Sequence, residues 1–283
     1  RESKRNRLIL SENDLSLSLS QEKLILSGWG EKAFYKTIVK KIVYNSDELE
    51  VEGYLAYPEF ITDKIPLIIW NRGGNRKDGK IDDFLAKGMF GEIASWGYAV
   101  LASNYRKDDE FGGRDVNDII SLIDLSKEIP FCDETKIGME GWSRGGMMTY
   151  KVLSKNSLIK CAVIISGLAD LFRSEVNRSG LSKVYRQLFG TADENEFKLR
   201  KEDRSAVNFA DRICKHTDIL LIHGTDDYKV SVQDSIEMYE KLNSAGIHCE
   251  LELIEKGDHY LKKNRQEVSE LRRNWFDKYL KKD

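Results

Sequence analysis

The chain has 283 residues, a length that allows one large domain or two small ones. Hydrophobic residues make up 41% and charged residues 33%, with only 3 prolines, so the composition is that of a compact globular protein and excludes a disordered or collagen-like chain. The 45 Lys and Arg residues nearly balance 47 Asp and Glu residues, and the net charge is -2. Such a chain has no overall field that would attract nucleic acid or an anionic membrane.

The apolar runs are too short to cross a bilayer. The run I-L-L-I at 219–222 is typical, whereas a spanning helix needs roughly 20 apolar residues. We therefore expect no membrane segment and a cytoplasmic protein. Because the chain begins with Arg1, export after removal of a signal peptide is the alternative. The sequence leaves assembly into a homo-oligomer open.

The four cysteines are widely separated, and no C-x-x-C pair or histidine cluster accompanies them. Metal sites built from cysteine need ligands at short, regular spacings. We therefore expect free thiols, no metal site and no organic cofactor. The four residues are Cys132, Cys161, Cys214 and Cys249.

The N-terminal part of the chain differs in pattern from the rest. Residues 1–34 are expected to form an extension, in which L-S-L-S-L-S from Leu15 to Ser20 alternates like a strand that has no obvious partner. From Thr37 to Tyr57, β-branched and aromatic residues surround a polar turn at 45–47, which predicts an antiparallel hairpin. Residues 35–283 are expected to form the main domain.

From about Leu67 onward, short apolar runs alternate with helical patterns, which indicates βαβ units and a mostly parallel sheet of the α/β class. The predicted strands are Leu67 to Trp70, Tyr98 to Ser103, Lys136 to Glu140, Cys161 to Ile165, Ile219 to His223 and Cys249 to Ile254. Helical faces are predicted around 116–123, 232–242 and 268–280. The 168–217 segment lies between two late strands and is too long for a plain connection, so we expect a lid-like helical insertion there.

The strongest chemical signal is G-W-S-R-G-G at 141–146, which follows a predicted strand and opens a helical stretch. This is the context of the G-x-S-x-G nucleophile elbow, in which a tight turn holds the serine hydroxyl above the sheet edge. Ser143 would be the nucleophile. The backbone N–H of Arg144, at the helix N-terminus, would point at a developing oxyanion.

A serine nucleophile needs a base, and the chain offers four histidines. In this fold the acid and then the histidine follow the serine along the chain. His259 lies in a loop directly after the last predicted strand, where catalytic groups gather. His223 precedes the candidate acid and is expected to pack beneath the loop, whereas His216 and His248 lie in polar stretches.

The acid is expected in the loop after the strand that ends at His223. Two adjacent residues compete there, Asp226 and Asp227. Neighbours in an extended loop point in different directions, so only one can accept a hydrogen bond from the imidazole. Spacing alone does not choose between them.

Three segments together resemble a known family. G-W-S-R-G-G, H-G-T-D-D-Y-K-V and G-D-H-Y, in this order, are similar to the catalytic domain of the prolyl oligopeptidase family of serine peptidases, over about Tyr35 to Leu280. The resemblance implies the α/β-hydrolase fold, without the N-terminal β-propeller of many relatives. It also implies Ser143 as nucleophile, His259 as base and Asp227, in the family's H-G-x-x-D-x-x-V motif, as the acid.

The segment Arg72-Gly73-Gly74 departs from the family, which usually has His or Tyr before the two glycines. A tyrosine there can donate to the oxyanion. The Arg72 guanidinium could donate instead, as could a backbone N–H of Gly73 or Gly74. The alternative is that Arg72 only pairs with an acidic neighbour.

The insertion is expected to shape the substrate pocket, since relatives build specificity there. Phe172, Tyr185 and Phe189 are candidates to line it, although a core within the insertion would explain them equally well. We expect a serine hydrolase that cleaves a small peptide or ester through an acyl-enzyme. The alternatives are a carboxylesterase acting on small esters and a catalytically silent binding protein that has kept the fold.

Overall fold

The computed structural model describes residues 8–76 and 78–281. The chain divides into two compact units that alternate along the sequence. The first unit comprises the described parts of Arg1–Trp70, Lys80–Lys107 and Asn117–Ile137. The second unit comprises those of Asn71–Gly79, Asp108–Val116 and Gly138–Asp283.

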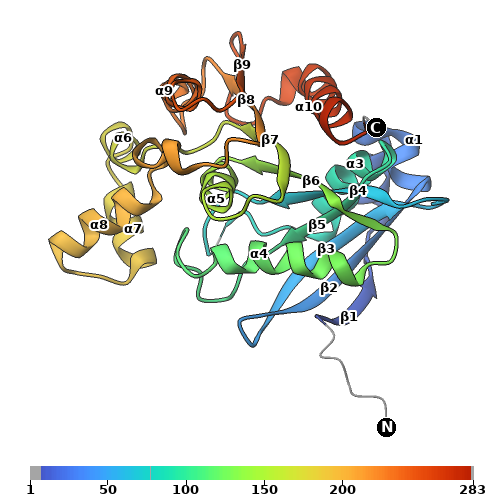
Figure 1. Ribbon diagram of the computed structural model, residues 1–283. Helices are drawn as coiled ribbons and strands as arrows, with labels where there is room; N and C mark the ends of the chain where they lie inside the picture. The colour runs from blue at the N-terminus through green and yellow to red at the C-terminus, as the bar shows by residue number, and fades with distance from the viewer. Residues whose placement is uncertain (1–7, 77, 282–283) are drawn as a thin grey trace. The chain divides into compact units, whose positions relative to one another are not determined.

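Strands and helices alternate over most of the chain (Figure 1). The strands are β1 Ile9–Asp14, β2 Thr37–Ser46, β3 Leu49–Pro58, β4 Ile65–Asn71, β5 Ala99–Ser103, β6 Cys132–Trp142, β7 Ile159–Ile165, β8 Asp218–Gly224 and β9 Cys249–Ile254. The α-helices are α1 Leu19–Tyr35, α2 Asp83–Leu85, α3 Gly91–Ser95, α4 Val116–Leu125, α5 Arg144–Leu153, α6 Leu171–Asn177, α7 Leu181–Phe189, α8 Glu194–Arg204, α9 Val232–Ser244 and α10 Arg265–Leu280. A π-helical turn at Ala86–Phe90 joins α2 to α3, and short 3-10 turns lie at Ser126–Glu128, Ala206–Asn208, Ala210–Arg212 and Lys262–Asn264.

The first unit contains the predicted antiparallel hairpin. Strands β2 and β3 pair in register from Thr37 opposite Pro58 to Ser46 opposite Leu49. Asp47 and Glu48 join them, both with positive φ (50° and 66°), which suits a two-residue turn between twisted strands. The strand order in this unit is β1-β2-β3-β5-β4-β6. The hairpin prediction is confirmed.

The alternating serines and leucines near the N-terminus do not form a strand. Helix α1 begins at Leu19, and the Ser18 side chain caps it by accepting from the Gln21 N–H, while Gln21 reaches back to the Ser18 N–H. This reciprocal cap favours a helix start over a strand. The strand of this region is β1 instead, which pairs antiparallel with β2.

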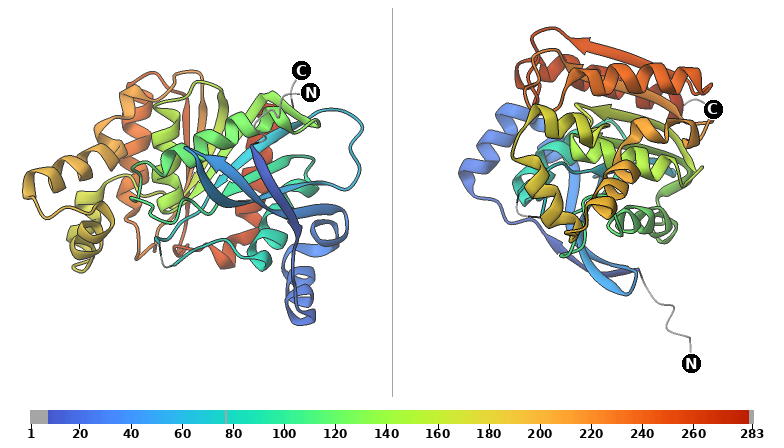
Figure 2. Two further views of the ribbon diagram at one scale, coloured as in Figure 1. Left: turned by 90° about the horizontal axis from the view of Figure 1, so that it is seen from below. Right: turned by 90° about the vertical axis from the view of Figure 1, so that its left-hand side faces the viewer.

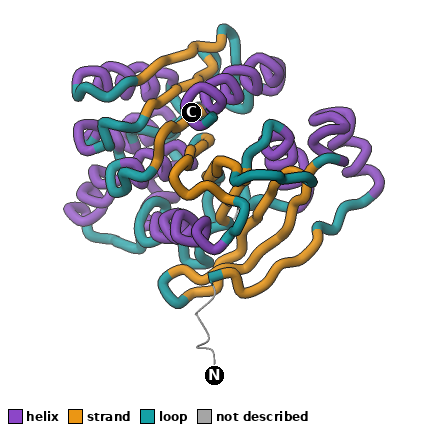
Figure 3. Tube along the Cα trace, turned by 45° about the vertical axis from the view of Figure 1, so that its right-hand side comes forward, coloured by secondary structure: helices purple, strands orange, loops and turns teal. Residues whose placement is uncertain are grey.

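The second unit holds the remaining strands, in the order β6-β7-β8-β9, with the second half of β6 at the start. β7 and β8 run parallel, as do β8 and β9. Helices α5 and α10 both contact β7, whose residues are almost all buried, and Figure 1 shows them on opposite sides of it. Figure 3 likewise shows orange strands flanked by purple helices. Parallel strands place their carboxyl ends at one edge, where the loops that follow them meet.

The expected helical insertion is present and carries α6, α7 and α8, which Figure 2 shows grouped in yellow and gold. Its aromatic side chains pack on one another. The Tyr185 and Phe189 rings stack with centroids 5.7 Å apart, and the Phe189 and Phe197 centroids are also 5.7 Å apart. The insertion therefore has a small core of its own. Across residues 8–76 and 78–281, no helix has both the length and the apolar composition that crossing a bilayer requires.

Candidate active site

Ser143 stands between β6 and α5 in an unusual backbone conformation. Its φ is 56° and its ψ is -119°, a region that a residue with a Cβ adopts only when the surroundings impose it. The Ser143 N–H donates to the Ile165 carbonyl at the end of β7 (3.0 Å), and its own carbonyl accepts from the N–H of Leu168 (3.0 Å). The turn is thereby tied to the carboxyl edge of the neighbouring strand.

The glycines on either side of Ser143 are required by close backbone packing. A Cβ on Gly141 would overlap the Gly145 carbonyl oxygen, and a Cβ on Gly145 would overlap the carbonyl oxygen of Asn71. No side chain larger than hydrogen fits at these two positions. The motif at 141–146 therefore has the tight strand-to-helix turn of a nucleophile elbow.

His259 and Asp227 meet in the loops that follow β9 and β8. His259 Nδ1 lies 2.7 Å from Asp227 Oδ2, and the aspartate side chain is fully buried. A carboxylate only accepts hydrogen bonds, so Nδ1 carries the proton and the neutral ring keeps Nε2 as an acceptor. The Asp226 N–H donates to the Gly257 carbonyl (3.0 Å), which ties the two loops together.

Of the two competing aspartates, the structure brings Asp227 to the imidazole. Asp226 is exposed to solvent, whereas Asp227 Oδ1 accepts from the N–H groups of Lys229 (2.8 Å) and Val230 (2.9 Å). Burial alone would raise the pKa of Asp227. The hydrogen bonds from His223, His259 and the Val230 backbone outweigh it and hold this pKa well below its usual range.

Ser143 and His259 lie at the same edge of the parallel strands. The Ser143 N–H bonds to the end of β7, and the Ser166 N–H bonds to the Ile222 carbonyl near the end of β8 (2.8 Å). Among the described residues, Ser143 Oγ and His259 form no direct hydrogen bond. Such bonds are often long without substrate and shorten in the reacting complex.

Gly73 lies directly against the nucleophile turn. A Cβ built on it would stand 3.1 Å from the Trp142 carbonyl oxygen and 3.3 Å from Ser143 Cβ. Ser143 is also the N-cap of α5, so the Arg144 N–H is the first of that helix. Two backbone segments that can present N–H groups, at Gly73 and at Arg144, thus flank the serine.

The Arg72 side chain is buried, with 1% of its surface exposed. One of its guanidinium nitrogens donates to the carbonyl oxygens of Gly73 (3.0 Å) and Asn75 (3.2 Å). Its Nη2 lies 3.5 Å from Asp109 Oδ2. The guanidinium therefore bonds to the carbonyl groups of the Gly73 loop.

The Arg144 side chain is buried as well and contacts two aspartates. Its Nη2 lies 3.0 Å from Asp109 Oδ1 and 2.7 Å from Asp115 Oδ2. Burial would raise the pKa of Asp115, but Arg144 and the N–H groups of Gly112 and Glu110 lower it overall. We call Arg72, Arg144, Asp109 and Asp115 the arginine–aspartate cluster.

Sequence reasoning did not identify Asp109 and Asp115 as parts of the site. The sequence did contain a signal for them. Arg144 lies inside the glycine-rich turn, and an arginine buried there needs a buried anion beside it. The sequence predicted that His223 packs beneath the loop and gave it no role.

The structure buries His223 completely, with its Nε2 3.2 Å from Asp227 Oδ2. His216 and His248 are exposed.

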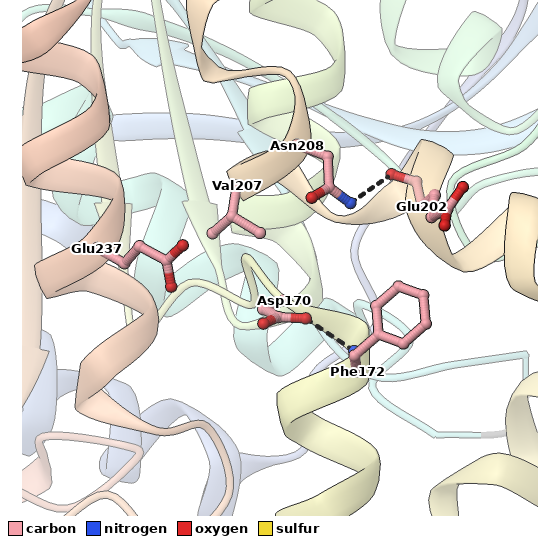
Figure 4. Close-up of a pocket in the computed structure, with 6 residues that line it drawn as sticks. All are labelled: Asp170, Phe172, Glu202, Val207, Asn208 and Glu237. Carbon is pink, nitrogen blue, oxygen red and sulfur yellow. Dashed lines mark hydrogen bonds between the residues drawn. The ribbon is translucent and has the colours of Figure 1, made fainter.

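A pocket of about 390 Å³ opens beside the start of α6 (Figure 4). It is lined by Asp170, Phe172, Glu202, Val207, Asn208 and Glu237. Of the predicted pocket residues, Phe172 therefore lines a cavity. Tyr185 and Phe189 do not line this pocket; they are buried in the insertion core, 2% and 3% exposed.

Within the described residues, no group of three or more His, Cys, Asp or Glu side chains could hold a metal ion.

The strand order and the strand-to-helix turn at Ser143 define the fold as that of the α/β-hydrolases. Residues 92–283, more than half of the chain, match the model of the prolyl oligopeptidase family. The chain belongs to this family and is a serine hydrolase of the serine peptidase type.

Relatives of known sequence differ in length. The chain is 28% identical over 240 residues to "Uncharacterized peptidase YtmA" of Bacillus subtilis, covering 81% of this chain and 90% of that protein. It is 26% identical over 290 residues to "Uncharacterized peptidase YuxL" of the same organism, covering 94% of this chain but 43% of that protein. The chain thus spans nearly all of one relative and less than half of the other.

Solved structures share the fold. A Pyrococcus horikoshii acylaminoacyl peptidase superposes with a TM-score of 0.75 at 23% identity, over 88% of this chain and 42% of that one. A Mycobacterium tuberculosis puromycin-hydrolyzing peptidase superposes with a TM-score of 0.74 at 19% identity, over 88% and 40% of the two chains.

Proposed function

We propose that this chain hydrolyses a peptide bond through an acyl-enzyme formed on Ser143. The observation that carries the proposal is the buried hydrogen bond between His259 Nδ1 and Asp227 Oδ2 (2.7 Å) at the strand edge where Ser143 stands. The preference for a peptide rests on the relatives, which are named as peptidases.

In the first step, Ser143 Oγ attacks the carbonyl carbon and His259 Nε2 takes the hydroxyl proton. A tetrahedral intermediate forms, and its C–N bond breaks as His259 returns the proton to the leaving amine. Asp227 holds the imidazole in the tautomer that leaves Nε2 free to accept. It also stabilises the charged ring without becoming protonated itself.

In the second step, a water molecule attacks the acyl-enzyme carbonyl. His259 takes a proton from the water and then gives it to Ser143 Oγ as the ester bond breaks. The products are a carboxylic acid and the free serine. The same histidine therefore serves as base and acid in turn, and the net reaction converts the peptide and one water molecule into a carboxylic acid and an amine.

The oxyanion of each tetrahedral intermediate would be held by two backbone donors, the N–H groups of Arg144 and Gly73. The packing of Gly73 against Ser143 supports this choice. The contacts of Arg72 favour a supporting role, since its guanidinium is directed to the carbonyl oxygens of the same loop. Donation by the Arg72 side chain itself stays a prediction.

A fluorophosphonate probe tests the nucleophile. We expect covalent labelling of the folded protein at Ser143, found by peptide mapping. Ser143→Ala should abolish the labelling, whereas Ser154→Ala, at the other end of α5, should preserve it. A folded wild-type protein that takes no label would instead indicate a binding protein that has lost its activity.

The substrate class needs a separate panel. Aminoacyl amides, short peptides and nitrophenyl esters should be compared by kcat/KM at equal enzyme concentration. We expect turnover of amide or peptide bonds as well as esters. Turnover of esters alone would make the protein a carboxylesterase, because both reactions use the same groups and differ in the leaving group.

A further inference from the structure

A second histidine contacts the aspartate of the candidate triad. His223 is the next-to-last residue of β8 and is fully buried. Its Nε2 lies 3.2 Å from Asp227 Oδ2 and 3.2 Å from the Val230 carbonyl oxygen. Its Nδ1 lies 2.7 Å from the hydroxyl of Ser235, which α9 presents and which is also fully buried.

These contacts determine which ring nitrogen carries the proton. Both oxygens that face Nε2, a carboxylate and a carbonyl, can only accept a hydrogen bond, so Nε2 must be the donor. In the neutral ring Nδ1 is then an acceptor, and the Ser235 hydroxyl donates to it. Hydrogen bonds therefore run in one direction, from Ser235 to His223 and on to Asp227.

The result is a carboxylate with no spare accepting position. Asp227 Oδ1 receives the N–H groups of Lys229 and Val230, and Oδ2 receives His259 and His223. Two oxygens with about four lone-pair sites are thus filled by four donors. A carboxylate bonded on all sides cannot rotate about its Cβ–Cγ bond without breaking at least one of these hydrogen bonds.

We propose that His223 is a positioning residue for the hydrolytic reaction. Through Nε2–H it fixes the plane of the Asp227 carboxylate, and the Ser235 hydroxyl sets the tautomer that makes this possible. The carboxylate in turn directs Nε2 of His259 toward the serine. The inference rests on the proposed function, since it assigns His223 to the triad's support.

Two substitutions of similar size separate this role from packing. In His223→Gln the amide nitrogen reaches about as far as Nε2 and can still donate to Asp227. In His223→Asn it reaches only as far as Nδ1 and cannot. We expect kcat to fall by less than about 5-fold in the Gln variant and by about 10- to 100-fold in the Asn variant, with KM nearly unchanged.

Two further variants complete the series. Ser235→Ala removes the donor that sets the tautomer, and we expect an intermediate loss in kcat. His248→Gln changes an exposed histidine outside the site and should leave kcat unchanged. If the Asn variant matches wild type, or if Gln and Asn lose equal activity, the positioning role is wrong.

The tautomer can be tested without any turnover. In wild-type protein with ¹⁵N-labelled histidines, long-range ¹H–¹⁵N correlation spectra distinguish Nδ1–H from Nε2–H rings, and the signals shifted in Ser235→Ala identify His223. We expect a neutral Nε2–H ring near neutral pH. An Nδ1–H or a doubly protonated ring would overturn the proposal even if the enzyme is active. Failure of Ser143 to react with the fluorophosphonate would instead overturn the proposed function and leave the tautomer result standing.

Discussion

The second unit contains two buried polar clusters of opposite character. The arginine–aspartate cluster pairs Arg72 and Arg144 with Asp109 and Asp115. The histidine–aspartate cluster joins Asp227 to His259 and His223. Both are built around carboxylates withdrawn from water, but the cations differ. Arginine stays charged at every relevant pH, whereas histidine gains and loses its proton near neutrality.

This difference in cations separates the clusters by role. A guanidinium does not exchange a proton in a catalytic cycle, so the arginine–aspartate cluster is not a proton carrier, and its contacts favour a role in fixing the backbone around Ser143 and Gly73. An imidazole can exchange a proton, so the histidine–aspartate cluster can move the proton. Changes in the arginine–aspartate cluster should therefore affect chiefly the free energy of unfolding. Changes in the histidine–aspartate cluster should affect chiefly kcat.

The largest expected effect is in the histidine–aspartate cluster. Ser143→Ala or His259→Ala should lower kcat by up to about 10⁶-fold, and Asp227→Ala by about 10⁴-fold, because the members act as a unit. The measurement is kcat on the substrate that the panel identifies. Thermal unfolding of the same variants shows whether each one is folded.

Asp226→Ala is the matched control for Asp227→Ala. The two residues are adjacent and chemically identical, but Asp226 is exposed. We expect it to keep most of the activity. A severe loss in Asp226→Ala together with a mild one in Asp227→Ala would show that the acid has been assigned to the wrong residue.

The arginine–aspartate cluster should respond through stability. Arg144→Met leaves the carboxylates of Asp109 and Asp115 buried with less compensating charge, and should lower the free energy of unfolding by about 3–5 kcal/mol. Urea unfolding measures this. Arg114→Met removes an exposed arginine that pairs with Glu110, and its effect should stay within about 0.5 kcal/mol. Equal effects in the two variants would contradict the structural role of the cluster.

Arg72 belongs to the arginine–aspartate cluster and also contacts the Gly73 loop. Its substitution therefore tests whether this cluster affects stability alone or kcat as well. Arg72→Leu leaves the partly buried carbonyl groups of Gly73 and Asn75 without this donor, which should lower the free energy of unfolding by about 1–3 kcal/mol. The loosened loop should also reduce kcat by about 10-fold. A fall in kcat of about 10²- to 10³-fold with unchanged stability would show instead that the guanidinium binds the oxyanion directly.

The histidine–aspartate cluster also predicts a dependence of stability on pH. The pKa of Asp227 is lowered in the folded protein, whereas an unfolded aspartate has a pKa of about 3.9. Its contribution to stability is therefore present above about pH 4 and is lost as the pH falls toward the folded pKa. Over this interval it changes the free energy of unfolding by up to about 1.4 kcal/mol per pH unit.

Asp227→Asn removes this titration. Urea unfolding at several pH values between 7 and 3 should show a shallower fall in stability below about pH 4 for the variant than for wild type. Identical slopes would mean that the carboxylate is not stabilised by its neighbours as the contacts indicate.

The sequence predicted the parts of the molecule that depend on local pattern. Each predicted strand from Leu67 onward is present, as are the hairpin and the helical insertion. The exception is the stretch from Leu15 to Ser20, where a helix cap at Ser18 prevailed over an alternating pattern. An alternating pattern of apolar and polar residues does not show which side chains bond to the backbone.

The candidate site was predictable only as far as motifs reach. Ser143 and His259 follow from residue type and position, and Asp227 from the family resemblance. The partners of Arg144 were not found, because Asp109 and Asp115 lie about 30 residues away along the chain and only the fold brings them to the elbow. Likewise, nothing in the sequence shows that His223 Nε2 faces a carboxylate, since this depends on the path of the loop after β8.

The smallest expected effect concerns the contact between the Gly73 loop and Ser143. Gly73→Ala would place a Cβ 3.1 Å from the Trp142 carbonyl oxygen and 3.3 Å from Ser143 Cβ, so the loop must shift by a few tenths of an ångström. If the Gly73 N–H holds the oxyanion, this shift should lower kcat by about 10-fold while KM changes little, because the interaction forms chiefly in the transition state. Gly180→Ala is the control, since a Cβ there has nothing within 4 Å, and its kcat should equal that of wild type. An unchanged kcat in Gly73→Ala would remove this loop from the oxyanion site and leave the Arg144 N–H as the backbone donor that the geometry supports.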